Sequence, residues 1–402
     1  MSKNIVVCCD GTGNQVDEGN LSNVLKLFQI MRKSADQRVY YNPGIGTIGT
    51  DDRWTKFKQD VKGVFGLATG YGLDDDIIAA YSYIAEHYQD GDAIFLFGFS
   101  RGAYTIRALA GFMHMVGLLP PDQANIVDYA LTAYKRSSEQ NNLHIAWDFG
   151  RITGARPVTI KFVGVWDTVA SIIVPRWDRL IPSLQTLPYT FRNPSVRIFR
   201  HAMAIDERRR MFRLNRWKQP QDYVADPFDS QAPEVQQDIK QVWFAGVHAD
   251  VGGGYPETES GLSKFPLAWM IEEAAQHGLQ INPGLRDYLV FGKPYFKSKH
   301  QYVAPNAEAE LHRSLTRAWQ LIEWIPKSVK YQEWPDRTKI DGFYVPSGEP
   351  RMIENETVRQ RIHQSVLDRM RLKTDYKPVN FPKDYDVEPW PYAPGAGAAA
   401  IE

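Results

Sequence analysis

The sequence predicts an α/β fold in which a mostly parallel sheet carries helices on both faces. Short apolar runs alternate with helix-like segments along the first 275 residues. The run Ala93–Phe97 is apolar without a break, as is typical of a strand buried on both faces of a parallel sheet. Val158–Val165 and Gln241–Val247 have the same character. Strands of this kind that alternate with helices predict a parallel sheet covered on both sides.

The first elements follow from local patterns. Ile5–Cys9 predicts a strand, and the Gly and Asn residues of 10–14 predict the turn that ends it. Asn23–Arg32 has apolar residues at helical spacing. Arg38–Asn42 predicts a second strand, which Pro43 and Gly44 close.

Later elements are less regular. We expect helices over Asp76–Tyr88, over Arg197–Phe212 and, with many charges, over Glu354–Arg371. Residues 377–402 end in Pro, Gly and Ala, which predicts a mobile tail. We therefore expect a catalytic domain over residues 1–345 and a C-terminal helix with a tail over 346–402.

An apolar insert is expected within the first domain. Ile172–Pro194 is rich in Pro, Trp and Leu without a clean period, and a basic cluster follows at Arg208–Arg216. We interpret residues of about 172–240 as a cap-like insert that contributes an acyl pocket or peripheral membrane contact. The alternative is core packing and a solvated helix face.

Composition excludes several classes of protein. The chain has 402 residues, 47 basic and 47 acidic side chains, and 43 % hydrophobic residues, as an ordinary globular protein does. A net charge of zero argues against a nucleic-acid partner bound through an overall basic field. Neighbouring strand residues point to opposite faces, so Cys8 and Cys9 are not expected to form a disulfide, which fits a reducing cytosol.

No targeting segment is evident. Met1–Asn4 leads directly into the apolar run Ile5–Cys9 without the pattern of a secretory signal. No stretch has the roughly 20 apolar residues that a membrane span needs. We expect a protein that is cytoplasmic as synthesised, and any export would use a route that does not read an N-terminal signal.

The strongest chemical signal is the G-x-S-x-G motif at residues 98–102. It follows the strand candidate Ala93–Phe97 and opens a helix whose apolar positions include Ala103 and Ile106. Strand, sharp turn and helix form a nucleophile elbow, which presents Ser100 at a helix N-terminus where an oxyanion is favoured. The alternative is a helix in which Ser100 is only the N-cap.

A serine needs a base and a carboxylate to become a nucleophile. Asp167 ends one apolar strand run and His248 ends another, in the order Ser, Asp, His that α/β-hydrolases use. Carboxyl ends of parallel strands meet at one edge of the sheet. We therefore expect an α/β-hydrolase-like fold with Ser100, Asp167 and His248 as catalytic residues.

Alternatives to these partners remain open. Asp250 could be the carboxylate or could hold the turn that follows it, and His312 could be the base, although no strand precedes it. Asp167 could be a cap or turn residue and His248 an interior histidine. His201 and His277 are interpreted as helix-surface residues.

The oxyanion hole needs two N–H donors. One is expected from Arg101, the residue after the nucleophile. The second is expected from Gly11 or Thr12, because glycine allows the backbone to come close. Asp10 is expected to support this loop through hydrogen bonds.

Neither a cofactor nor a metal is expected. The glycines of 63–72 lack a P-loop pattern, and no Cys/His zinc spacing occurs. Asp10, Asp167, His248 and Asp250 could in principle hold a divalent metal, as in a phosphohydrolase. That alternative leaves the elbow around Ser100 unexplained.

Four ordered blocks of sequence resemble one family. The blocks are residues 9–14, 97–104, 164–169 and 244–255, and residues 200–208 resemble a further block. The family is the α/β-hydrolase domain family that includes the Tle1-type phospholipase effectors of the type VI secretion system. The resemblance implies hydrolysis of esters, often phospholipid acyl esters, without a cofactor, and assigns the serine, aspartate and histidine to Ser100, Asp167 and His248. It also implies a secretion-system or immunity protein as partner.

The sequence therefore predicts a serine esterase or lipase, similar to a phospholipase A, that acts on lipid or other esters. Two other classes stay open. One is a non-catalytic binding module on a hydrolase fold, and the other is a metal-dependent phosphohydrolase.

Overall fold

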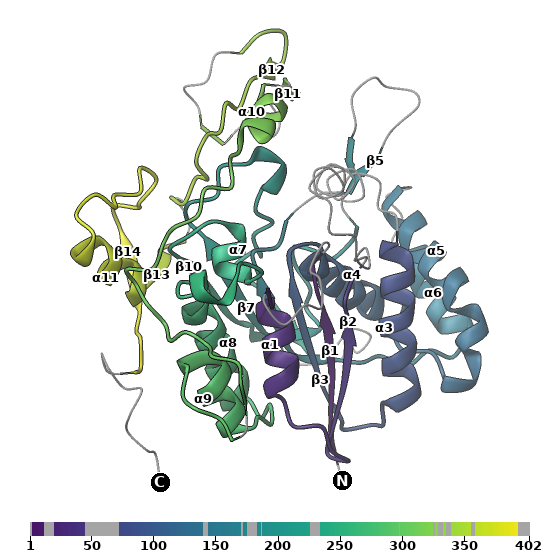
Figure 1. The fold of residues 1–402 in the computed structure, drawn as a ribbon. Coiled ribbons are helices and arrows are strands. Elements are labelled where there is room, and N and C mark those ends of the chain that lie inside the picture. Colours follow the sequence, from purple (N-terminus) through teal and green to yellow (C-terminus); the bar gives the residue numbers. More distant parts are fainter. Residues whose placement is uncertain are drawn as a thin grey trace.

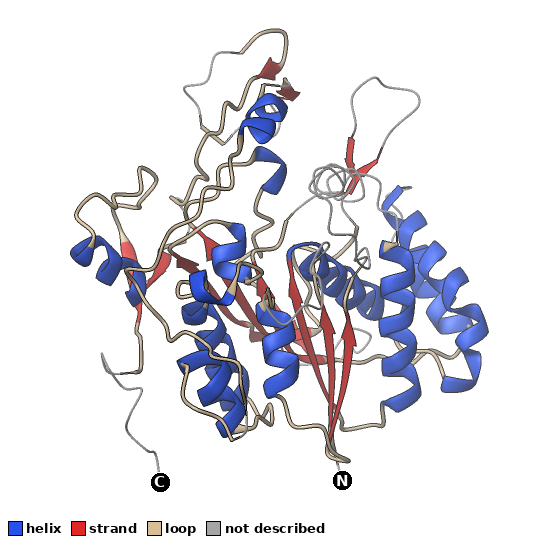
Figure 2. Ribbon diagram, in the orientation of Figure 1, coloured by secondary structure: helices blue, strands red, loops and turns tan. Residues whose placement is uncertain are grey.

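The computed structural model describes most of the chain (Figures 1 and 2). It describes residues 2–11, 20–44, 72–139, 144–169, 172–174, 183–185, 187–225, 234–296, 298–324, 326–328, 333–334, 339–354 and 358–392. Thr12, the glycine-rich residues 63–71, most of the apolar segment 172–186 and the end of the chain from 393 lie outside these residues.

One parallel sheet organises the described residues. Its eight strands lie in the order β14–β13–β10–β7–β4–β3–β1–β2, and every neighbouring pair runs parallel. Their bounds are β1 Asn4–Cys9, β2 Gln37–Asn42, β3 Ala93–Phe99, β4 Ile160–Trp166, β7 Val196–Ala204, β10 Asp238–Phe244, β13 Gln360–His363 and β14 Tyr385–Glu388. The predicted α/β class is confirmed.

The strand order sets where a site can form. The chain starts at β1, adds β2 at one edge, and then continues from β3 on the other side of β1. The connections leave in opposite directions from β1 and β3, which makes this pair a topological switch point. Ligands of open α/β sheets bind at such a point, outside the carboxyl ends of the strands, which point upward in Figure 2.

Helices cover both faces of the sheet. Their bounds are α1 Asn23–Ile30, α3 Leu73–His87, α4 Ser100–Val116, α5 Val127–Glu139, α6 His144–Ile152, α7 His248–Gly252, α8 Lys264–Gln276, α9 Pro283–Phe291, α10 Arg317–Glu323 and α11 Gln364–Leu372. Helices α3 to α6 pack on one face, and α1, α8 and α9 pack on the other.

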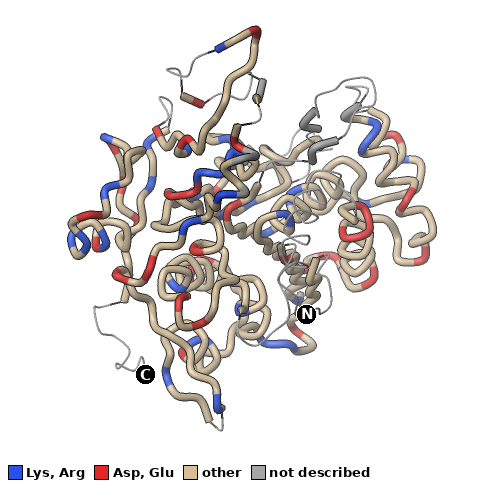
Figure 3. The backbone as a smooth tube through the Cα atoms, turned by 45° about the horizontal axis from the view of Figure 1, so that its top comes forward, with Lys and Arg blue, Asp and Glu red and all other residues tan. Residues whose placement is uncertain are grey.

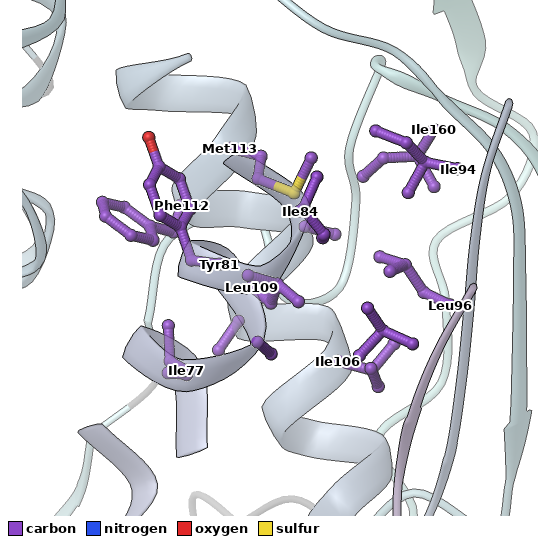
Figure 4. Packing of buried hydrophobic residues seen from close by; sticks show 14 of the residues in the cluster. Ile77, Tyr81, Ile84, Ile94, Leu96, Ile106, Leu109, Phe112, Met113 and Ile160 are labelled. Carbon is purple, nitrogen blue, oxygen red and sulfur yellow. The ribbon is translucent and has the colours of Figure 1, made fainter. Parts of the chain in front are cut away.

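The two faces have separate cores. Ile5, Val7 and Cys9 of β1 point to the α3–α6 side, whereas Val6 and Cys8 point to the other side. Figure 4 shows how α3 and α4 pack against strands of the sheet on the first side. Full burial of such a side chain stabilises the fold by about 1.5–3 kcal/mol. Both cysteines are free, as their adjacent positions predict.

The predicted helix Arg197–Phe212 is wrong. Residues 196–204 form β7, a central strand between β4 and β10, and only Arg210–Phe212 is helical, as a short 3-10 turn. Arg200 is buried there because Glu273 and Asp238 pair with its guanidinium at 2.5 and 2.8 Å. Since β7 falls inside the predicted insert of about 172–240, that part of the range belongs to the sheet.

The predictions for the C-terminal region also need correction. The segment expected as a helix over Glu354–Arg371 contains strand β13 before α11. Residues 385–388 of the expected tail form β14, the edge strand that pairs with β13. The C-terminal region thus extends the same sheet as the first strands.

Smaller features complete the description. Three two-stranded sheets and short 3-10 turns occur among the described residues: β5 Ile172–Val174 with β6 Ser183–Gln185, β8 Asp222–Val224 with β9 Glu234–Gln236, β11 Lys327–Ser328 with β12 Phe343–Tyr344, and the turns Pro121–Ile126 and Glu257–Glu259. Basic and acidic positions are interleaved along the chain in Figure 3. Within the described part, no helix combines the length and the apolar character that crossing a membrane requires.

Candidate active site at the carboxyl edge of the sheet

Ser100 lies at the sharp turn between β3 and α4. Its φ is +56°, in the left-handed region, which a non-glycine residue adopts only under constraint. A Cβ on Gly102 would lie 2.2 Å from the carbonyl oxygen of Cys9, and a Cβ on Gly98 would lie 2.6 Å from the carbonyl oxygen of Gly102. The two glycines therefore let α4 start directly against β1 and β3, as a nucleophile elbow requires.

The turn after β1 contacts this serine. A Cβ on Gly11 would lie 3.2 Å from Cβ of Ser100. Asp10 is buried, and its carboxylate accepts hydrogen bonds from the N–H of Gly11 (2.7 Å), from the hydroxyl of Tyr41 (2.8 Å) and from the hydroxyl of Ser22. Asp10 thus forms hydrogen bonds with this turn and with two neighbouring hydroxyl groups.

The hydrogen bonds of this turn affect which of the predicted backbone N–H groups can donate to an oxyanion. The N–H of Gly11 is donated to Asp10 and is therefore already engaged. Thr12 lies outside the described residues. Arg101 is buried in the first turn of α4, and its guanidinium pairs with Asp76 at 3.1 Å. Its backbone N–H is located at the positive end of the helix dipole.

Asp167 ends the strand beside that of Ser100. In the parallel register, Phe99 pairs with Trp166, so Ser100 and Asp167 follow their strands at equivalent positions. Asp167 is fully buried and has a φ of +38°. Its Oδ2 accepts a hydrogen bond from Nδ1 of His248 at 2.5 Å.

His248 opens α7, just beyond the end of β10. Its backbone N–H donates to Glu207 at 3.2 Å, and its ring contacts the rings of Phe99 and Phe212, with centroids 4.7 and 4.9 Å away. A Cβ on Gly252 would lie 1.9 Å from the ring of Phe99, so only glycine lets α7 pack this closely. The ring contact with Phe99 brings His248 to the residue that precedes Ser100.

The electrostatics of the pair favour a base. Burial alone would raise the pKa of Asp167, but Arg351 and His248 lower it well below its usual range. Burial lowers the pKa of His248. At neutral pH the pair therefore combines a charged carboxylate with a neutral imidazole, whose Nδ1 side is held by that carboxylate.

Two further buried residues, Arg351 and Glu207, contact this pair, and neither was predicted from the sequence as a site residue. Arg351 donates to both carboxylate oxygens of Asp167, at 2.6 and 3.0 Å. Glu207 accepts from the N–H of His248 and pairs with Arg209 at 2.9 Å. Glu207 lies within residues 200–208, the further block that resembles the family, so the sequence contained a signal for it. Arg351 lies in an irregular stretch without any local pattern.

The alternative residues form a second pair. His312 places its Nδ1 2.6 Å from Asp250 and its Nε2 3.0 Å from Glu259, and it stacks on Tyr255. The hydrogen bond with Asp250 raises the pKa of His312 to about 9. Because both ring nitrogens already face carboxylates, this imidazole has no lone pair to accept a substrate proton.

Two further histidines were assigned to helix surfaces. For His201 that prediction is wrong, because it is fully buried in β7 and its Nε2 accepts the N–H of Thr168. Burial lowers its pKa to about 3. His277 follows α8 with 29 % of its side chain exposed.

The residues offered for a metal are otherwise engaged. Among the described residues, no group of three or more His, Cys, Asp or Glu side chains is arranged to hold a metal ion. Both oxygens of Asp167 face the guanidinium of Arg351. The carboxylate of Asp167 is therefore paired with a guanidinium.

The basic cluster at 208–216 is largely paired. Its ion pairs and hydrogen bonds join Arg209 to Glu207, Arg210 and Arg213 to Glu333, and Arg216 to the carbonyls of Met352 and Ile353. Arg210, Arg213 and Arg216 thus contact residues of the C-terminal region, whereas Arg209 is paired locally.

The fold and this edge of the sheet define an α/β protein of hydrolase-like architecture. Residues 3–273 match the family described as "T6SS, Phospholipase effector Tle1-like, catalytic domain". Since this match covers more than half of the chain, the chain belongs to that family. The family resemblance given by the sequence blocks is confirmed.

A curated relative shares low sequence identity with the chain. The chain is 26 % identical over 404 residues to Uncharacterized protein YEL023C of Saccharomyces cerevisiae, a match that covers 70 % of this chain and 58 % of the yeast protein. It spans only part of that relative's length.

Two solved structures share weaker similarity. One is an uncharacterized protein from Pseudomonas aeruginosa, 18 % identical with a TM-score of 0.39, matched over 71 % of this chain and 47 % of that chain. The other is the Tle1 effector bound to the VgrG spike of the type 6 secretion system, 21 % identical with a TM-score of 0.30, over 65 % and 52 % of the two chains.

Proposed function

We propose that this protein is a serine hydrolase that cleaves carboxylic esters of lipids, with phospholipid acyl esters as the substrate class. The single observation that carries the proposal is the buried Asp167–His248 pair at the strand ends beside the elbow of Ser100. A charged carboxylate behind a neutral imidazole is the arrangement that activates a serine hydroxyl.

The reaction would proceed through an acyl-enzyme. Oγ of Ser100 attacks the ester carbonyl while Nε2 of His248 takes the hydroxyl proton. The N–H of Arg101, at the start of α4, donates to the oxyanion. When the intermediate collapses, His248 returns the proton to the leaving alcohol, and water then releases the acid by the same steps.

The proposed substrate class is supported by the family and does not rest on a pocket. Membership of a phospholipase effector family supports a lipid ester. The solved Tle1 effector is bound to the VgrG spike, which supports a secretion-system spike protein as partner and export by that route. An immunity protein that covers the site in the producing cell is a further partner of the same proposal.

A fluorophosphonate probe tests the nucleophile. Wild type is expected to be labelled at Ser100, as mass spectrometry of the modified peptide would show, and Ser100→Ala to lose labelling and ester turnover. Ser137→Ala serves as the matched control, because Ser137 is also buried but lies in α5 and donates to a backbone carbonyl.

The outcomes separate the three classes of function. Equal labelling of wild type and Ser100→Ala would refute the nucleophile. Turnover that EDTA abolishes and Ser100→Ala leaves intact would indicate a metal-dependent phosphohydrolase. A folded protein without turnover on p-nitrophenyl esters and phospholipid vesicles would indicate a binding module.

A further inference from the structure

Arg351 is the most unusual group near the candidate site. It is buried and lies beyond residues 3–273, which match the family. Its Nη1 and Nη2 donate to the two oxygens of Asp167, as a fork that matches the carboxylate. The same nitrogens also donate to the carbonyls of Ala204 (3.0 Å) and Phe212 (2.6 Å).

The segment that carries Arg351 is held on both sides. Asn380 donates to the carbonyl of Arg351 at 2.9 Å, and Arg216 donates to the carbonyls of the next two residues. The side chain of Ile353 is buried in a core with β7 and β10. The guanidinium is therefore pre-positioned and does not depend on a flexible side chain reaching from the surface.

Asp167 needs such a partner. Its charge is fully buried, and an unpaired buried carboxylate would protonate instead of remaining an acceptor for His248. The N–H of Ala204 and Nδ1 of His248 alone supply two hydrogen bonds. Arg351 adds two more together with a positive charge.

We propose that Arg351 is a positioning residue that keeps Asp167 charged and oriented toward His248, and that it thereby sets the pH below which activity is lost. This inference rests on the proposed function, since it assigns a role in the same reaction. Arg351 does not touch the substrate in this role, because it acts entirely through Asp167.

The charged groups around His248 fix the direction of the effect. They are Asp167 at the end of β4, Glu207 and Arg209 after β7, and Arg351 behind Asp167. His201, on β7, is neutral in this environment. Loss of the Arg351 cation lets the His248–Asp167 pair bind a proton more easily, so the acid limb of kcat/KM moves to higher pH.

Three variants separate charge from geometry. Arg351→Met is expected to lower kcat about 10- to 100-fold with little change in KM, and to move the acid limb upward by about 1 pH unit. Arg351→Lys keeps the charge but not the fork, so kcat falls while the acid limb stays near that of wild type. Arg369→Met is the control, since Arg369 is a buried arginine that donates to the carbonyls of residues 307 and 309.

An NMR titration of histidine-labelled protein measures the effect without activity. With the His248 signal assigned through His248→Gln, its pKa is expected to rise by about 1 unit in Arg351→Met and to stay within a few tenths of a unit in the other two variants. An unmoved pKa in Arg351→Met, or an equal rise in Arg369→Met, would overturn the inference.

Failure of the two proposals can be told apart. If wild type is active and Ser100→Ala is not, wild-type kcat in Arg351→Lys and Arg351→Met overturns the role of Arg351 alone. If wild type is neither labelled nor active, the proposed function fails, and the titration still tests the coupling to His248. If Arg351→Met does not fold, the kcat of Arg351→Lys is the test. A lower kcat than that of wild type supports the inference, and a wild-type kcat overturns it.

Discussion

Asp167–His248 and Asp250–His312 are histidine–carboxylate pairs of similar length and opposite character. Asp167–His248 spans 2.5 Å and Asp250–His312 spans 2.6 Å. Burial lowers the pKa of His248, whereas the hydrogen bond with Asp250 raises the pKa of His312 to about 9. One imidazole is therefore neutral at pH 7 and the other is charged.

The difference lies in what surrounds each pair. The carboxylate of Asp167 also pairs with a guanidinium, and the His248 ring contacts two phenylalanine rings. His312 instead meets a second carboxylate, Glu259, at its other nitrogen. A short His–Asp contact is thus not sufficient evidence for a base, because the remaining neighbours decide whether the imidazole can accept a proton.

Matched substitutions in the two carboxylates give the largest contrast. Asp167→Asn should lower kcat by about a thousandfold or more, because the wrong imidazole tautomer then faces the serine. Asp250→Asn should change kcat less than about fivefold and lower the free energy of unfolding by about 1–3 kcal/mol. Ester turnover and urea unfolding measure both, and a larger kcat loss in Asp250→Asn would transfer the catalytic role to the second pair.

The Asp250–His312 pair should make the free energy of unfolding depend on pH. The folded pKa of His312, about 9, lies above its ordinary value of 6.5. Its stabilisation is therefore complete below pH 6.5 and is lost as pH rises through 9, by about 1–2 kcal/mol after allowance for solvent screening. The difference in unfolding free energy between wild type and His312→Gln should shrink over this range, and a constant difference would contradict the assignment.

A smaller effect concerns the outer carboxylate. Glu259 is 46 % exposed, so Glu259→Gln should lower the pKa of His312 by only about half a unit. Histidine NMR titration measures this shift, with the His248 signal as an internal reference that should not move. If the pKa of His312 instead fell to its ordinary value, Glu259, and not Asp250, would be the residue that keeps His312 protonated.

Sequence patterns were sufficient where short-range rules apply. Ser100, Asp167 and His248 all follow apolar strand runs, and parallel strands deliver their carboxyl ends to one edge. The contact between Asp167 and His248 at this edge could therefore be predicted. The catalytic roles stay predictions until the variants are measured.

The features that could not be predicted from the sequence depend on ion pairs and strand pairs between residues far apart in the chain. Arg200 and His201 interrupt the apolar pattern of β7, and Arg200 is neutralised by residues 38 and 73 positions away. Strands β13 and β14 are short, with polar residues, and exist only because they pair at the sheet edge. Arginine side chains are usually exposed. The sequence around Arg351 therefore does not indicate burial, which depends on its ion pair with the distant Asp167.

The separation of 184 residues between Asp167 and Arg351 has a consequence during translation. At about 5–20 residues per second, the ribosome adds the arginine about 10–40 seconds after the aspartate. For that interval the nascent chain carries a carboxylate destined for the interior without its counter-ion. The segment that carries Arg351 must therefore dock before Asp167 reaches its mature electrostatic state.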